Sequence, residues 1–218
     1  MQSPLMRIDW AEENLIVIRT LMERSAVYRR ALAPVMGLVG ATGIAAGAAG
    51  AALDFKTSRL FAVYWAAVAL VCLTEAFLLI RRQAIKELEP FWSPPARRVA
   101  QAAAPAFLMG LAAGIVFFIL DIVPEGGVVL LLVPIWMILY GLAMHAAGFF
   151  MPRGVRIFGW GYVLAGVGGI ACCIFHLLSF EPDFPFLNSN IAMGALFGGG
   201  HMAYGLYLHF TEKPEIVV

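Results

Sequence analysis

Four ionisable side chains lie within long apolar stretches of this sequence: Glu75, His145, His201 and His209. Ionisable groups are costly at membrane depth and usually face the interior of a protein. Histidine changes its charge near neutral pH, so imidazole and carboxylate groups together can pass protons or bind a polar solute. The four residues therefore indicate a ligand site or a proton pathway. The alternative is that each side chain only hydrogen-bonds a neighbouring helix.

Three of these residues could also form a metal site. Glu75 and His145 lie 70 residues apart, at corresponding places in two apolar segments, and His209 closes the last segment. Two histidines and one carboxylate can bind zinc or iron and leave coordination positions open. The sequence thus allows a divalent transition metal as cofactor, held by Glu75, His145 and His209. Paired histidines at four-residue spacing, the short signature of many zinc enzymes, are missing, and no residue is assigned a catalytic role.

Another polar group falls at the ends of apolar segments, away from most of the basic residues. It consists of Asp121, His176, Glu181 and Asp183. Together these residues would form an acidic outer rim that attracts cations. They could equally be parts of solvated loops.

The elements that must position these residues are membrane helices. The chain is 61% hydrophobic and only 13% charged, with a mean hydropathy of +0.84, whereas soluble domains are about 25% charged. A spanning helix needs about 20 apolar residues. We therefore predict an all-α, polytopic membrane helical bundle in residues 31–210, followed by a cytoplasmic tail in residues 211–218. Its six transmembrane helices are expected at residues 31–53, 60–80, 103–122, 128–150, 157–180 and 190–210.

The distribution of basic residues predicts the orientation of the bundle. Thirteen of the fifteen lysines and arginines fall before the first segment, in the second and fourth connections, or in the tail. The other side has Lys56 and Arg59 alone. Because lysine and arginine accumulate on the cytoplasmic side, both termini are expected in the cytoplasm. This asymmetry accounts for the basic residues, so nothing in the sequence indicates nucleic-acid binding.

Residues 1–30 are expected to form an amphipathic interfacial helix. Asp9 and Glu12 have the spacing of a capping box, and Leu15, Ile18 and Met22 recur at helical spacing. Such a helix can lie flat on the lipid bilayer. Alternatively, residues 9–30 dock on a cytoplasmic protein partner.

Part of this segment resembles a known family. The run from Ile18 to Ser25 reads IRTLMERS, and Tyr28 and Arg29 follow it. This IRxLMERSxxYR pattern is similar to the N-terminal motif of a family of uncharacterised six-span bacterial integral membrane proteins. The resemblance implies a multi-pass protein of the bacterial inner membrane, and it implies no activity.

The bundle could be built from three repeated hairpins. The stretch YGLAMH at residues 140–145 matches YGLYLH at residues 204–209, an offset of 64 residues. Pro34 and Pro105 open two other segments in similar contexts. Chance similarity is the alternative, because Gly, Ala and Leu are abundant. Small residues also recur at four-residue spacing, which favours close packing of helices inside the bundle over homodimerisation; examples are Gly43 and Gly47, Gly110 and Gly114, and Gly194 and Gly198.

Three functions are compatible with these features. The first is binding or transport of a small solute or ion through a polar site within the bundle, because repeated hairpins are a common way to build transporters. The second is a membrane-embedded, metal-dependent enzyme that uses two histidines and one glutamate. The third is a non-catalytic membrane subunit or sensor that engages a cytoplasmic partner through its N-terminal helix.

Overall fold

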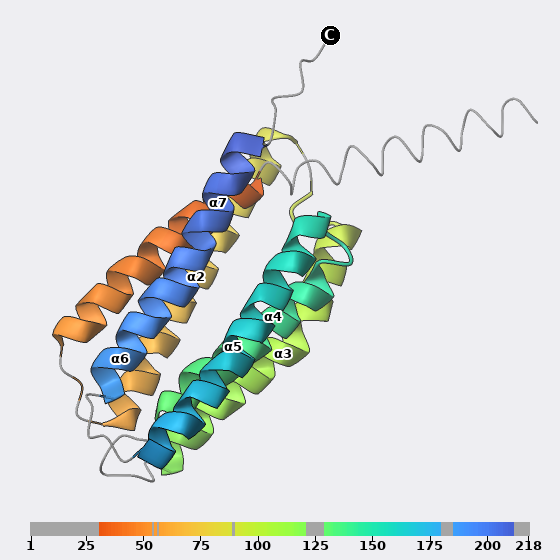
Figure 1. The fold of residues 1–218 in the computed structure, drawn as a ribbon. Helices are drawn as coiled ribbons and strands as arrows, with labels where there is room; N and C mark the ends of the chain where they lie inside the picture. The colour runs from red at the N-terminus through yellow and green to blue at the C-terminus, as the bar shows by residue number, and fades with distance from the viewer. Residues whose placement is uncertain are drawn as a thin grey trace, which may run out of the picture.

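A computed structural model describes residues 31–53, 55, 57–88, 90–120, 129–179 and 185–211, and all regular structure within them is helical. The helices run along one long axis and form a rod (Figure 1). The helix Ala31–Ala52, α2 and the α6–α7 run make up one side of the rod, and α3, α4 and α5 make up the other (Figure 1). The elements are α2 (Ser58–Lys86), α3 (Pro94–Leu120), α4 (Val129–Ala147), α5 (Arg153–Ser179), α6 (Pro185–Ala192), a π-helix (Met193–Gly198) and α7 (Gly199–Thr211).

The helices have the length and the surface of a membrane protein. Four of them are long and apolar enough to cross a bilayer: Ala31–Ala52, Arg59–Lys86, Ala96–Ile119 and Arg153–Phe175. Large apolar side chains cover their outer faces, and Leu108 and Leu164 are more than half exposed. An apolar surface of this extent fits lipid and not water. The predicted all-α membrane bundle is thus confirmed in its class.

The sequence predicts six spans, whereas four of the described helices are long and apolar enough to cross a bilayer. The apolar stretch Leu131–Ala147 of α4 is shorter than the four, and the last predicted span consists of three successive helical elements. There α6, the π-helix and α7 follow one another without a break through residues 185–211, which we call the terminal run. Several predicted features lie outside the described residues, namely the helix at residues 1–30, the tail beyond Thr211, Asp121, Glu181, Asp183 and the side chain of His176.

Glycines bring the first helix and the terminal run into backbone contact. A Cβ atom on Gly43 would lie 2.8 Å from the Cα atom of Gly198, and one on Gly47 would lie 3.0 Å from the backbone nitrogen of Gly194. Only glycine permits such an approach, which gives membrane helices their van der Waals contact. The prediction that these small residues serve packing inside the bundle is confirmed for this pair of helices.

The helices α4 and α5 meet in the same way. A Cβ atom on Gly141 would lie 2.6 Å from the carbonyl oxygen of Gly159, and one on Gly166 would lie 2.7 Å from the carbonyl oxygen of Pro134. In α3 the glycines have another use. Gly114 leaves room for the indole of Trp136, whose Nε1 donates to the carbonyl oxygen of Gly110 at 2.8 Å.

The ends of α2 are defined by local chemistry. The hydroxyl of Thr57 accepts a hydrogen bond from the Leu60 amide at 3.2 Å and caps the start of the helix. Arg59 Nε donates to the carbonyl oxygen of Phe118 at 3.1 Å, so the start of α2 lies against the end of α3. At the other end Leu88 has φ of 54° and turns the chain out of the helix.

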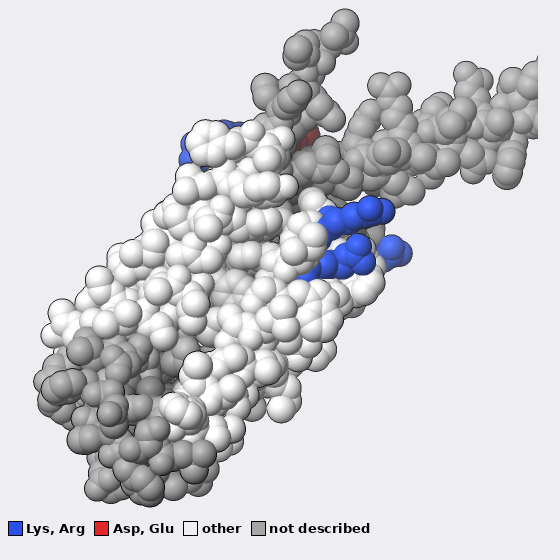
Figure 2. Space-filling view, in the orientation of Figure 1, with Lys and Arg blue, Asp and Glu red and all other residues white. Residues whose placement is uncertain are grey.

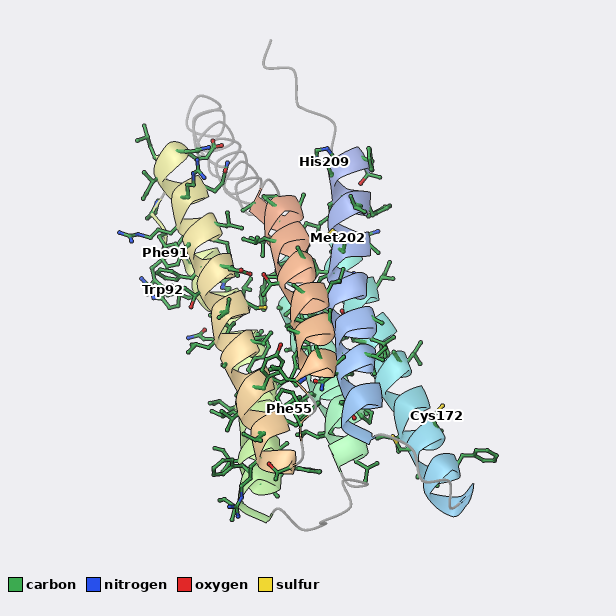
Figure 3. The ribbon with its side chains drawn as sticks, turned by 90° about the vertical axis from the view of Figure 1, so that its left-hand side faces the viewer. Phe55, Phe91, Trp92, Cys172, Met202 and His209 are labelled. Atoms are coloured by element: carbon green, nitrogen blue, oxygen red, sulfur yellow. The ribbon has the colours of Figure 1, made fainter. Side chains whose placement is uncertain are left out.

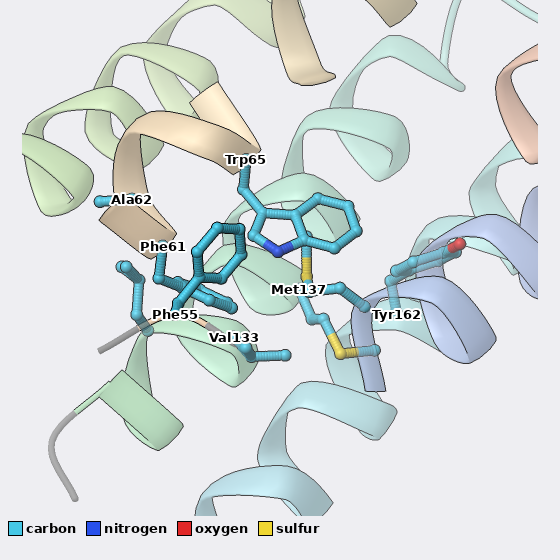
Figure 4. Close-up of a cluster of buried hydrophobic side chains, with 9 residues drawn as sticks. Phe55, Phe61, Ala62, Trp65, Val133, Met137 and Tyr162 are labelled. Carbon is cyan, nitrogen blue, oxygen red and sulfur yellow. The ribbon is translucent and has the colours of Figure 1, made fainter. Parts of the chain in front are cut away.

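The largest buried cluster among the described residues combines aromatic and aliphatic side chains (Figure 4). Phe61 and Leu132 have no exposed surface, and Trp65 is 2% exposed. Phe61 stacks on Trp136 with ring centroids 6.3 Å apart. This cluster joins α2, α4 and α5 through Phe61, Trp65, Leu132, Val133, Met137 and Tyr162.

Candidate functional site

A carboxylate and a hydroxyl meet between the first helix and α2. The Thr42 hydroxyl donates to Glu75 Oε1 at 2.8 Å. The other carboxyl oxygen, Oε2, is buried and has no hydrogen-bond partner. Nearby on the same two helices the packing is apolar, with Val39 and Cys72 in one buried cluster. Buried polar atoms are nearly always paired in native proteins, so an unpaired carboxyl oxygen requires an explanation.

His201 lies at the centre of a second polar group. Its side chain is 1% exposed. Nδ1 lies 2.7 Å from the carbonyl oxygen of Phe197, and Nε2 lies 2.5 Å from the Tyr140 hydroxyl. A carbonyl oxygen can only accept, so Nδ1 carries the hydrogen and the Tyr140 hydroxyl donates to Nε2. Both ring nitrogens are therefore occupied within the protein.

The π-helix supplies the acceptors of this network. Its wider turns leave carbonyl groups available to side chains, and such segments are frequent at functional sites. The Tyr162 hydroxyl lies 3.0 Å from the carbonyl oxygen of Leu196 and 2.9 Å from that of Phe197. It also lies 3.0 Å from Nδ1 of His201. Tyr162 and His201 together therefore satisfy the carbonyl groups at the end of the π-helix.

Phe197 connects the His201 network with the region of Glu75. Its ring centroid lies 4.3 Å from that of His201 and 5.4 Å from that of Tyr140. Phe197 also packs against the buried cluster that contains Cys72, three residues before Glu75. Glu75 and His201, two of the four predicted site residues, thus belong to one region inside the bundle.

A third polar group lies toward the other end of α2. Trp65 Nε1 donates to Asn190 Oδ1 at 2.8 Å, and Asn190 Nδ2 donates to the carbonyl oxygen of Gly50 at 2.9 Å. Asn190 and Ser189 are each 1% exposed. Ser189 Oγ has no hydrogen-bond partner. This group connects the first helix, α2 and α6 by side-chain hydrogen bonds.

The predicted metal set is not assembled. The ring centroid of His145 lies 5.4 Å from that of Phe149 and 5.3 Å from that of Trp160. His209 is exposed at the end of α7 (Figure 3). Across the described residues, no group of three or more His, Cys, Asp and Glu side chains could hold a metal ion. The structure therefore does not bring Glu75, His145 and His209 together as a ligand set, because their helices direct these side chains toward different neighbours.

Some residues of the site are not identified by the sequence analysis. Tyr140 and Tyr162 bond to His201, and Asn190 bonds to Trp65. Of the three, only Tyr140 lies in a stretch that the sequence comparison singles out, YGLAMH. Tyrosine and asparagine in the middle of apolar segments were the available signal. Membrane tyrosines gather at the interfaces, so those at mid-depth are candidates for interior hydrogen bonds.

Comparison with known proteins gives no match to a family model, to a curated protein or to a solved structure. The resemblance carried by the IRxLMERSxxYR pattern stays a prediction. Function therefore has to be inferred from the geometry inside the bundle.

Proposed function

We propose that this protein binds a small ion or solute, in the simplest case a proton, at Glu75 and passes it through the bundle. The observation that carries the proposal is the buried, unpaired Oε2 of Glu75. A charged carboxylate in an apolar interior is costly unless a cation or a proton compensates it. The protein keeps this group where an apolar side chain would pack without cost, which is typical of a transported or exchanged species.

The oxygen atoms near Glu75 favour a proton over a metal cation. Thr42 gives its hydrogen to Oε1, and apolar residues of the Val39–Cys72 cluster pack around these helices. Calcium and magnesium need six or more oxygen ligands, partly from water. A single carboxyl group needs no further ligand to bind a proton. One carboxyl and one hydroxyl therefore suit proton binding best.

Further polar groups at other depths extend a route along the bundle. Trp65 and Glu75 lie ten residues apart on α2, which is about 15 Å along a helix. The Trp65–Asn190 pair thus belongs to a level different from that of Glu75 and Thr42. The His201 network adds two hydroxyl groups and an imidazole next to Phe197. Groups of this kind can exchange protons through hydrogen bonds and intervening water.

The proposed architecture is a protein of the bacterial inner membrane with six spans and with both termini on the cytoplasmic side. Three repeated hairpins would each consist of two successive spans, and the contacts between helices agree with that arrangement. Within the middle hairpin α3 meets α4, and neighbouring hairpins meet where α2 contacts α3, α4 contacts α5, and the terminal run contacts the first helix. The matching YGL stretches agree with this pattern. Gly141 in the first copy approaches Gly159 on α5, and Gly205 in the second approaches Gly37 on the first helix. Equivalent glycines thus make equivalent contacts.

Proton flux into proteoliposomes tests the proposal. The full-length protein is reconstituted with a trapped pH-sensitive dye, and a potassium diffusion potential drives proton entry. We expect flux well above that of empty liposomes and a loss of at least tenfold in Glu75→Gln, which keeps the shape of the side chain and removes its proton exchange.

The matched control is Glu87→Gln. Glu87 lies beyond the end of α2 and accepts a hydrogen bond from Gln83 at 2.9 Å. This variant should retain flux within twofold of the parent. A parent protein no faster than empty liposomes, or a Glu75→Gln variant as fast as the parent, would overturn the proposal.

The two other functions have less support. The hypothesis of a metal-dependent enzyme has no assembled ligand set, since Glu75, His145 and His209 do not come together. Docking of a cytoplasmic partner through residues 9–30 involves a segment outside the described residues. It stays a prediction from the sequence.

A further inference from the structure

Four side chains form a basic–aromatic cluster where α4 ends and α5 begins. The His145 ring lies 5.4 Å from Phe149 and 5.3 Å from Trp160, in both cases edge to face. The Arg156 guanidinium lies over the Phe149 ring, 5.1 Å from its centroid. His145 and Phe149 are four residues apart, as are Arg156 and Trp160. Each helix thus contributes a cation-capable side chain and an aromatic one, and the pairs contact each other crosswise.

Glycines make this arrangement possible. Gly148 has no Cβ where the Arg156 side chain crosses, so the arginine can reach over Phe149. A Cβ atom on Gly159 would lie 2.6 Å from the backbone nitrogen of His145, so this glycine allows α5 to approach the helix that carries the histidine. The cluster is therefore positioned by the close α4–α5 contact and does not depend on chance surface conformations.

The cluster contains an unsatisfied donor or acceptor. Nδ1 of His145 is buried and has no hydrogen-bond partner. Neither the proposed route through the bundle nor any other hydrogen bond uses this atom. An orphaned imidazole nitrogen in a cluster that also contains a guanidinium points to a missing anionic or polar group.

The cluster lies at the ends of two apolar helices. His145 lies two residues before the end of α4, and Arg156 lies three residues after the start of α5. Trp160 is 52% exposed and Ile157 is 72% exposed, so the surface beside the cluster is apolar. The basic side chains visible in Figure 2 lie toward one end of the rod, and most of the remaining described surface is uncharged. Tryptophan with basic residues at such a boundary is typical of the membrane interface.

We propose that this cluster binds the phosphate group of an anionic phospholipid. The Arg156 guanidinium would pair with the phosphate oxygens, as guanidinium groups do in phosphate sites. The imidazole of His145 would turn Nδ1 toward this group and donate to it in the tautomer that carries the hydrogen on Nδ1. Trp160 and Phe149 would pack along the glycerol and the first acyl carbons. The exposed apolar surface beside the arginine favours a lipid over free phosphate, because only a lipid covers both parts of the site.

Lipid binding to the purified full-length protein tests this site. Native mass spectrometry in detergent gives the affinities for phosphatidylglycerol, phosphatidylcholine and inorganic phosphate. We expect phosphatidylglycerol to bind at least fivefold more tightly than phosphatidylcholine. Arg156→Gln and His145→Gln should each weaken phosphatidylglycerol binding at least fivefold, while an unchanged thermal transition shows that the variants fold.

The control is Arg82→Gln, an exposed arginine near the end of α2, which should change the affinity less than twofold. Equal binding of the two lipids would overturn the proposal. Unchanged affinity in both cluster variants would also overturn it. Displacement of the lipid by millimolar inorganic phosphate would show that the site takes free phosphate instead. Proton flux in Arg156→Gln is measured separately, so the two proposals can fail independently.

Discussion

The imidazole of His201 is fully enclosed, and its hydrogen bonds hold three segments together. Its Nε2 accepts from Tyr140 on α4, its Nδ1 donates to Phe197 in the π-helix, and Tyr162 on α5 lies next to both. Phe158 also lies edge to face with the ring at 5.2 Å. A side chain that satisfies both nitrogens in this way stabilises a specific packing of helices.

Removal of His201 is expected to destabilise the bundle. In His201→Ala the Tyr140 hydroxyl loses its acceptor, and a cavity forms among aromatic rings. We expect a loss of about 3 kcal/mol in the free energy of unfolding, from the unpaired group and the cavity together. Equilibrium unfolding in mixed detergent micelles measures it. His209→Ala, in the same run but exposed, should change the value by less than about 0.5 kcal/mol; similar losses in both variants would contradict this role.

At this scale the sequence locates ionisable groups but not their partners. Glu75 and His201 stand out because charged or titratable residues are rare in apolar segments. Tyr162 and Asn190 could not be assigned, because their hydrogen bonds to His201 and Trp65 connect residues far apart in sequence. His145 was grouped with Glu75 on spacing alone. Which way a side chain points around its helix depends on which neighbours that helix meets.

At the scale of the elements, glycine placement decides which helices touch. The first helix has one face on which Gly40, Gly43 and Gly47 approach the backbone of the terminal run. Gly37, on the same helix, has space beside it, since a Cβ atom there would meet nothing within 4 Å. Substitution of glycine by alanine is therefore expected to have different effects at the two kinds of position.

Gly43→Ala is expected to destabilise the protein by about 2 kcal/mol, because a methyl group would enter the backbone of Gly198 and force the helices apart. Gly37→Ala should be neutral or stabilise by up to about 1 kcal/mol, since alanine is the better helix former. Thermal unfolding of the two purified variants, followed by circular dichroism, makes the comparison. Equal shifts for both would mean that the close contact at Gly43 is unimportant.

Most helices of the bundle could be predicted from their apolar length. The expected segments at residues 60–80, 103–122 and 157–180 each fall largely within α2, α3 and α5. The π-helix Met193–Gly198 could not be predicted. The hydroxyl of Tyr162 and the imidazole of His201 form hydrogen bonds with it. Such tertiary contacts cannot be deduced from the periodicity of the sequence.

At the scale of the whole molecule, charge differs between the two ends of the rod. On the face in Figure 2 the basic side chains gather near one end. The exposed residues Arg81, Arg82, Arg97 and Arg98 belong to the ends of α2 and α3 that face each other across one connection. Lysine and arginine are retained in the cytoplasm during insertion, so this end is expected to face inward.

Reporter fusions test the orientation. Alkaline phosphatase fused after residue 218 should be inactive, and a fluorescent protein fused there should be bright. Both results are expected of a C-terminus that lies in the cytoplasm. The same phosphatase fused after residue 55, in the first connection, should be active. An active phosphatase at residue 218 would contradict this topology, because it would require the opposite orientation or a different number of spans. The class of the protein and its charge asymmetry could be predicted from composition, whereas the pairing of the helices required the glycine contacts.

The contact between the first helix and the terminal run has a consequence for synthesis. Gly47 and Gly194 are separated by most of the chain. At roughly 5–20 residues per second, the first helix leaves the ribosome on the order of 10 s before its partner is made. During that interval the glycine face is without the segment that contacts it in the folded protein. Chains truncated before residue 190 would lack the partner helix, so the glycine face of the first helix would remain without its contact.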